Sequence, residues 1–151
     1  REKGYRQVLQ QAGIEPVVLT VDFNTPNSER PGLIRERLNL VADDVDAVFA
    51  TDDLAAAQVM EWAAQRDLRI PDDFKVIGFD GTVAMQHALP ALTTIQQPIT
   101  KLARAAVDLL LKRIDSATAV SAQSTQSGGP GVEDLQAPSP MPVKLLPGRT
   151  A

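Results

Sequence analysis

Three apolar, β-branched runs of this chain each end on acidic residues. They cover residues 17–22, 47–53 and 75–80. Helical patterns precede the first run and separate each run from the next, which is the order expected of strands in a parallel sheet. Ligands of such sheets bind outside the carboxyl ends of the strands, so these carboxylates are placed where a ligand would sit. Carboxylates accept paired hydrogen bonds, which suits a neutral polyhydroxylated ligand such as a sugar and disfavours a phosphate.

The composition is that of a globular protein with one sizeable core. Of the 151 residues, 44% are hydrophobic and 23% are charged, and the net charge of −4 gives no sign of a nucleic-acid partner for this piece alone. The chain has no cysteine and one histidine, so we expect no disulfide, no metal site and no cofactor. No apolar run approaches the roughly 20 residues that span a bilayer. We therefore expect no membrane association, and a cytoplasmic location fits.

Hydrophobic periodicity predicts an α/β fold in which a parallel sheet is flanked by helices. The expected strands cover about 17–21, 46–50 and 75–79, with short extended segments at 93–95 and 142–146. The expected helices cover about 1–13, 33–40, 52–66, 85–89 and 99–114. Residues 116–141 are rich in Ser, Gln, Thr, Gly and Pro, a composition that predicts disorder. Because the chain opens in a helical pattern without an initiator Met or a signal peptide, we expect a chain cut from a longer one.

Four short segments recur in an order and spacing that is specific when taken together. They are Ala50–Ala55 (ATDDLA), Ile70–Asp73 (IPDD), Val76–Gly81 (VIGFDG) and Leu92–Pro98 (LTTIQQP). In this order they resemble the effector-binding core of the lactose-repressor (LacI/GalR) family of bacterial transcription regulators. The resemblance covers the chain except for about 24–32 and 116–141. The third and fourth segments are similar to repressors of ribose or sucrose utilisation.

This resemblance implies a periplasmic-binding-protein-like sensor of two lobes, which holds a small effector between them, and a helix-turn-helix that binds operator DNA. The helix-turn-helix and most of the first lobe are absent from this chain. Residues 1–97 would form the C-terminal lobe, itself incomplete, and residues 98–115 the crossover helix of the other lobe. Residues 116–141 would be the low-complexity segment, and residues 142–151 the terminal strand and tail. Because the apolar stripe of the 99–114 helix would lack its partner, we expect the isolated chain either to be poorly stable or to bury this stripe against a second copy, as a homodimer.

The resemblance also implies effector-binding roles for six residues. They are Arg1, Phe23, Thr51, Asp52, Asp80 and Gln97. Asp80 would accept hydrogen bonds from sugar hydroxyls, with a turn role before Gly81 as its alternative. Arg1 would reach a hydroxyl, and its alternative is that of a disordered terminal residue. Phe23 would offer an aromatic face to a sugar ring.

The other three candidates lie beside the strand ends. Thr51 stands where family members often carry an Asn that donates to the effector, and this departure leaves the identity of the effector open. Asp52 matches the recurrent acid beside it, with helix capping as its main alternative. Gln97 matches a family residue that faces the effector at the crossover, and its alternative is backbone pairing at the hinge.

The predicted function is therefore the sensing of a sugar by a LacI-type regulator, most simply a repressor of carbohydrate-utilisation genes, without catalysis. A periplasmic sugar-binding protein would share the fold and the polar cleft. A phospho-acceptor signalling domain would also carry acids at strand ends, but with its acidic pair after the first strand and a Lys after the last. A hydrolase has no support, because no nucleophile and base stand at a recognised spacing.

Overall fold

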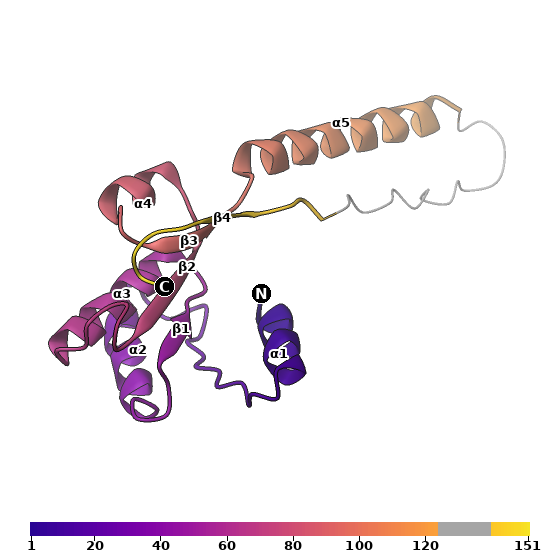
Figure 1. Ribbon diagram of the computed structural model, residues 1–151. Coiled ribbons are helices and arrows are strands. Elements are labelled where there is room, and N and C mark those ends of the chain that lie inside the picture. The colour runs from indigo at the N-terminus through magenta and orange to yellow at the C-terminus, as the bar shows by residue number, and fades with distance from the viewer. Residues whose placement is uncertain (124–139) are drawn as a thin grey trace. The chain divides into compact units, whose positions relative to one another are not determined.

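The computed structural model describes residues 1–123 and 140–151, which divide into two compact units. The first unit consists of residues 1–96 together with 144–151, and the second of residues 97–143. The first unit holds the sheet and its helices, and it therefore contains most of the candidate site residues (Figure 1). The chain returns to this unit after the second unit, so the first unit is discontinuous in sequence.

The sheet of the first unit is mixed, with three parallel strands and one antiparallel strand. Its strands are β1 (Ala47–Phe49), β2 (Lys75–Asp80), β3 (Thr93–Gln96) and β4 (Lys144–Leu146), in that spatial order. The first three pair in parallel, as predicted, and β4 pairs antiparallel to β3. The carboxyl ends of β1 and β2 therefore lie at the same edge of the sheet. The expectation of an α/β fold is confirmed, with the refinement that the last strand runs the other way.

Four helices accompany the sheet in the first unit. They are α1 (Glu2–Gln11), α2 (Arg30–Asn39), α3 (Asp53–Gln65) and α4 (Val83–Ala88). Gly13 follows α1 with a φ of +71°, as its expected role as a helix stop required. α2 begins about three residues earlier than expected, because Pro31, expected in a loop, lies in its first turn. α2 packs against α3, and α3 packs against β2 (Figure 1). The parallel strands are thus connected by helices, as parallel pairing requires.

The core lies between α2, α3 and the sheet and is built mainly from aliphatic and aromatic side chains. Its buried members are Leu38, Ala50, Ala56, Val59, Trp62, Ala63, Phe74, Val76 and Leu92. The rings of Trp62 and Phe74 pack at a tilt with 5.5 Å between their centroids. The indole Nε1 of Trp62 donates a hydrogen bond to Asn39 Oδ1 over 2.8 Å, so the polar end of the ring is satisfied at the edge of the core.

Thr150 ties the returning end of the chain into this core. The residue is 3% exposed. Its hydroxyl donates to the Val76 carbonyl over 2.7 Å and accepts from the Thr93 amide over 2.9 Å. The Val76 amide in turn donates to the Thr150 carbonyl. A single residue near the C-terminal side of β4 thereby bridges β2 and β3.

The expected strand at 17–21 is wrong: these residues form no ladder with any strand in the described part of the chain. Together with β1 they line a cavity. Neighbouring strands must lie about 4.8 Å apart for their backbone groups to pair. In the described part of the chain no strand pairs with this segment, so its β-branched sequence forms no ladder.

The second unit contains a longer helix than the sequence indicated. α5 runs from Ile99 to Gln123, past the expected end at residue 114. Residues 116–123, which belong to the segment expected to be disordered, are part of this helix. The rest of that prediction, residues 124–139, lies outside the described residues. Within residues 1–123 and 140–151, no helix is long and apolar enough to cross a membrane.

An ion pair forms within the loop that connects α3 to β2. The guanidinium of Arg69 donates to both carboxylate oxygens of Asp73 at 2.7 Å each, and the Arg69 amide donates to the same carboxylate. The hydrogen bonds from Arg69 lower the pKa of Asp73 to about 2. Since the pKa is depressed in the fold, any stabilisation from this exposed pair is present at neutral pH and lost as the pH falls through about 2.

The core assignment is tested by a matched pair of phenylalanine substitutions. Phe74→Ala removes a ring that is 2% exposed, and it should lower the free energy of unfolding by about 3–5 kcal/mol through lost burial and an unfilled cavity. Phe23→Ala removes a ring that is 90% exposed, and it should change stability by less than about 0.5 kcal/mol. Urea unfolding followed by circular dichroism measures both. Equal effects of the two substitutions would contradict the placement of the core.

Candidate functional site

A cavity of about 650 Å³ opens at the carboxyl ends of β1 and β2. One end of its wall is polar and includes Arg1, Thr51, Asp52 and Asp80. The other end is apolar and lies between the 17–21 segment, β1 and α2. Four of the six predicted site residues are thus brought together in one cavity. Most of the wall was not predicted from the sequence.

Asp80 ends β2 and holds an unusual backbone conformation. Its φ of +109° lies in the left-handed half of conformational space, where a side chain is strained. Such a conformation costs on the order of 1–3 kcal/mol and persists only where the surrounding structure enforces it. Gly81 follows with a φ of +57°, and a Cβ atom there would lie 2.7 Å from the Gln96 Cα atom. The turn after β2 is therefore tightly packed against β3.

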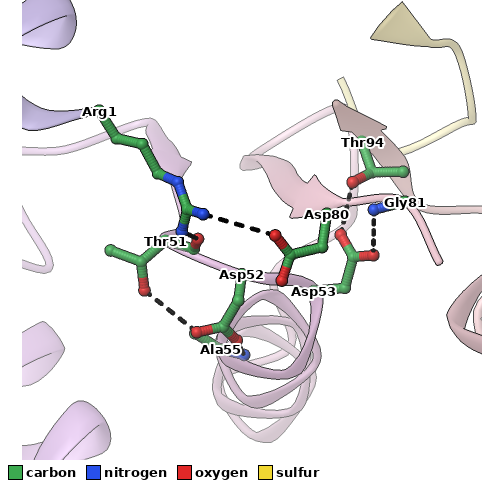
Figure 2. A network of polar contacts seen from close by, with 8 residues as sticks. All are labelled: Arg1, Thr51, Asp52, Asp53, Ala55, Asp80, Gly81 and Thr94. Atoms are coloured by element: carbon green, nitrogen blue, oxygen red, sulfur yellow. Dashed lines mark hydrogen bonds and ion pairs between the residues drawn. The ribbon is translucent and has the colours of Figure 1, made fainter. Parts of the chain in front are cut away.

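Arg1 reaches across from the start of α1 to this turn. Its Nη2 atom lies 3.5 Å from Asp80 Oδ1, and its guanidinium donates to the Thr51 carbonyl (Figure 2). The guanidinium carbon also lies 4.0 Å from the centre of the Phe79 ring, in cation–π contact. Arg1 is thus a member of the site's polar cluster, and its contact with Phe79 was not predicted from the sequence.

Thr51 and Asp52 connect β1 to α3. Asp52 is the N-cap of α3, and its Oδ1 atom accepts the Ala55 amide over 2.7 Å. The Thr51 hydroxyl lies 3.3 Å from Asp52 Oδ2 and donates to it (Figure 2). The capping role that we weighed for Asp52 is confirmed. Its contact with an effector stays a prediction, as does that of Thr51.

Asp53 is the residue of this region that sequence reasoning missed. It is 2% exposed, although it lies beside the solvent-accessible cap residue. Its Oδ2 atom accepts the Gly81 amide over 2.9 Å and its Oδ1 atom accepts the Thr94 hydroxyl (Figure 2). The available signal was Gly78, because a glycine inside a strand often marks a close approach. A Cβ atom at position 78 would come within 3.0 Å of Asp53 Oδ1.

The structure does not bring Phe23 and Gln97 to this cavity wall. Phe23 is 90% exposed, and its carbonyl accepts a hydrogen bond from Arg30. Gln97 is the first residue of the second unit. Their roles as effector contacts stay predictions. Asp22, at the end of the first apolar run, forms a turn in which its Oδ1 atom accepts the Asn24 amide over 2.7 Å.

The polar end of the cavity is suited to hydrogen bonding with a neutral ligand. Arg1 supplies donors and Asp80 supplies acceptors, with partly exposed side chains at 42% and 32%. Hydroxyl groups can both donate and accept, so a polyhydroxylated molecule can satisfy both partners. No group of three or more His, Asp or Glu side chains that could hold a metal ion occurs in the described ranges.

Comparison with known proteins assigns the chain to a family. Residues 1–129 match the periplasmic binding protein-like domain, so the chain belongs to that family. It is 31% identical over 115 residues to the ribose operon repressor of Halalkalibacterium halodurans, covering 76% of this chain and 34% of the relative. It is 29% identical over 151 residues to the sucrose operon repressor of Pediococcus pentosaceus, covering 100% of this chain and 41% of the relative.

A solved structure agrees with this assignment. The complex of the transcriptional regulator CelR with cellobiose superposes with a TM-score of 0.73 at 26% identity, covering 99% of this chain and 41% of that one. These similarities confirm the predicted resemblance to the effector-binding region of LacI-type regulators. The chain spans about two fifths or less of the length of each of these proteins.

The cap of α3 yields a testable prediction. Asp52→Ala removes the acceptor of the Ala55 amide and should lower the free energy of unfolding by about 1 kcal/mol. Asp52→Ser keeps a capping oxygen and should retain most of that stability. Thermal unfolding of both variants beside the wild type measures the difference. If alanine and serine proved equally stable at this position, the capping role would be refuted.

Proposed function

We propose that this chain is part of the sugar-sensing region of a LacI-type transcriptional regulator, a repressor of carbohydrate-utilisation genes. The observation that carries the proposal is the convergence of Arg1, Thr51 and Asp80 on one cavity at the carboxyl ends of β1 and β2. A sugar would exchange hydrogen bonds with the guanidinium and the carboxylate in that cavity. The relatives support a sugar, since their names refer to the ribose and sucrose operons.

In this proposal the sugar acts by closing a hinge between two lobes. The sugar would contact Asp80 in the lobe described here and groups of the other lobe, which lie outside the first unit. Closure would change the affinity of paired DNA-binding domains for their operator. The coupling between effector and operator would be reciprocal and typically about 1–3 kcal/mol. The operator would be bound by a domain that residues 1–151 do not include.

The other classes considered from the sequence receive less support. A transport-associated sugar-binding protein would share the fold and the cavity, but the relatives described above are named as operon repressors and a transcriptional regulator. A phospho-acceptor domain would need an accessible acidic pair at one strand end. Here Asp52 caps α3 and Asp53 is buried. Neither catalysis nor a cofactor is part of the proposed function.

The effector role of Asp80 is tested by calorimetric titration of the full-length regulator with D-ribose, sucrose and cellobiose. We expect binding of at least one of these sugars. Asp80→Ala should weaken that binding by about 10- to 100-fold, because a charge-assisted acceptor is lost. The control is Asp43→Ala, which removes an exposed acid that does not line the cavity. The proposal fails if none of the three sugars binds or if the Asp80 variant binds as tightly as the wild type.

We also propose that α5 mediates association with a second copy of the chain. Large apolar side chains on this helix are exposed, including Leu102 at 38%, Leu110 at 57% and Ile114 at 51%. Burial of such a stripe is favourable at about 25 cal/mol per Å² of apolar area. A homodimer of the isolated chain is the expected product.

Light scattering coupled to size-exclusion chromatography tests this association. The wild-type chain should elute as a dimer, and the double variant Leu102→Lys with Leu110→Lys should shift toward monomer, because both charges would be buried at the contact. The control Asp115→Lys changes the net charge by the same amount at an exposed position and should remain dimeric. A wild-type chain that stays monomeric at high concentration would dismiss the idea.

A further inference from the structure

The buried carboxylate of Asp53 is not the cap of its own helix. Asp52 already caps α3 by accepting the Ala55 amide. Asp53 also lines the cavity, but its carboxylate is directed toward the turn after β2 and toward β3, where it accepts two hydrogen bonds (Figure 2). Burying a carboxylate is costly unless charge-assisted hydrogen bonds compensate for the lost hydration. Its two partners, the Gly81 amide and the Thr94 hydroxyl, supply those bonds.

The Gly81 amide belongs to the peptide unit that joins Asp80 to Gly81. Because Asp53 accepts this N–H, it fixes the orientation of that peptide plane. The carbonyl of Gly81 is held as well, by the side-chain amides of Gln86 over 2.6 Å and Gln96 over 3.3 Å. Hydrogen bonds to the backbone of Gly81, the next residue, thus maintain the strained φ of +109° at Asp80.

The same conformation determines where the Asp80 side chain points. From this position its carboxylate lies 3.5 Å from the Arg1 guanidinium, at the polar end of the cavity. A relaxed peptide plane would let Asp80 adopt an ordinary extended conformation and would redirect its side chain. The space that Gly78 leaves open is what allows Asp53 to come this close to β2.

We propose that Asp53, fixed by Thr94, is the positioning residue of the effector site: it holds the Asp80–Gly81 peptide so that Asp80 faces the effector. This inference rests on the proposed function of Asp80 as an effector contact. Asp53 itself touches no effector. Its acceptor oxygen for the Gly81 amide is the essential feature, and its negative charge is not.

The first test is spectroscopic and needs no sugar. Amide hydrogen exchange of the chain, measured by ¹H–¹⁵N spectra, should show a protected Gly81 amide in the wild type. In Asp53→Ala this amide should exchange about tenfold faster or more, because its buried acceptor is lost. Asp53→Asn keeps one acceptor oxygen for Gly81, and its NH₂ group can donate to the Thr94 hydroxyl oxygen, so protection should be restored. Unchanged Gly81 exchange in the alanine variant would overturn the inference.

The second test is a double-mutant cycle on sugar affinity in the full-length regulator, using whichever of D-ribose, sucrose and cellobiose binds. Asp53→Ala should weaken binding about tenfold, and Asp53→Asn should recover most of the affinity. In an Asp80→Ala background, adding Asp53→Ala should weaken sugar binding by less than about a further twofold, because Asp53 acts through Asp80. Losses that simply add would overturn the positioning role, since a general loss of structure does not depend on Asp80.

Further variants cover the case in which Asp53→Ala does not fold. Thr94→Val keeps the shape but removes the hydroxyl that fixes Asp53, so affinity should fall about threefold, whereas Thr94→Ser should bind like the wild type. Equal affinities of the valine and serine variants would overturn the role of Thr94. If no probe sugar binds the wild type, the proposed function fails, while the Gly81 exchange measurement still decides whether Asp53 positions the turn.

Discussion

The buried carboxylate of Asp53 is the constraint on which this edge of the sheet depends. Three segments far apart in sequence meet at it: the start of α3, the turn after β2 and the middle of β3. A carboxylate in a low-dielectric interior tolerates few arrangements of its partners, because each missing hydrogen bond leaves an expensive charge. The rigidity of the Asp80–Gly81 turn, the close approach at Gly78 and the accessible position of the Asp80 carboxylate all follow from satisfying this one group.

The two adjacent acids at the start of α3 therefore divide two tasks between them. Asp52 faces the helix end, where its carboxylate meets exposed backbone amides and the positive end of the helix dipole. Asp53 faces inward and holds the neighbouring strands. The wall of the cavity likewise has two parts. Its polar end has acceptors and donors fixed by backbone contacts, and its apolar end is lined by the 17–21 segment, β1 and α2.

The sequence predicted those features that depend on local patterns. Helix periodicity located α1, α2 and α3, and the β-branched runs located β1 and β2, because burial follows the same periods in the fold. It failed at 17–21, since a run of valines forms a strand only where a neighbour stands at pairing distance. The resemblance to the LacI family assigned Arg1, Thr51, Asp52 and Asp80 to an effector site, and in the structure the four line one cavity. The sequence alone could not separate the roles of Asp52 and Asp53. Only the directions of the two side chains in the fold distinguish a helix cap from a buried residue that accepts hydrogen bonds from neighbouring segments.

The return of the chain to complete the sheet has a further consequence for sequence variation. β3 and β4 are adjacent in space but separated by the whole of the 97–143 segment, and Thr150 fastens the returning end to Val76 and Thr93. The entropic cost of closing a loop grows only with the logarithm of its length, and each doubling costs about 0.6 kcal/mol. The sheet therefore places little thermodynamic limit on insertions or deletions between its third and fourth strands. The short run from Lys144 to Thr150, by contrast, is held in its register by specific hydrogen bonds to β2 and β3.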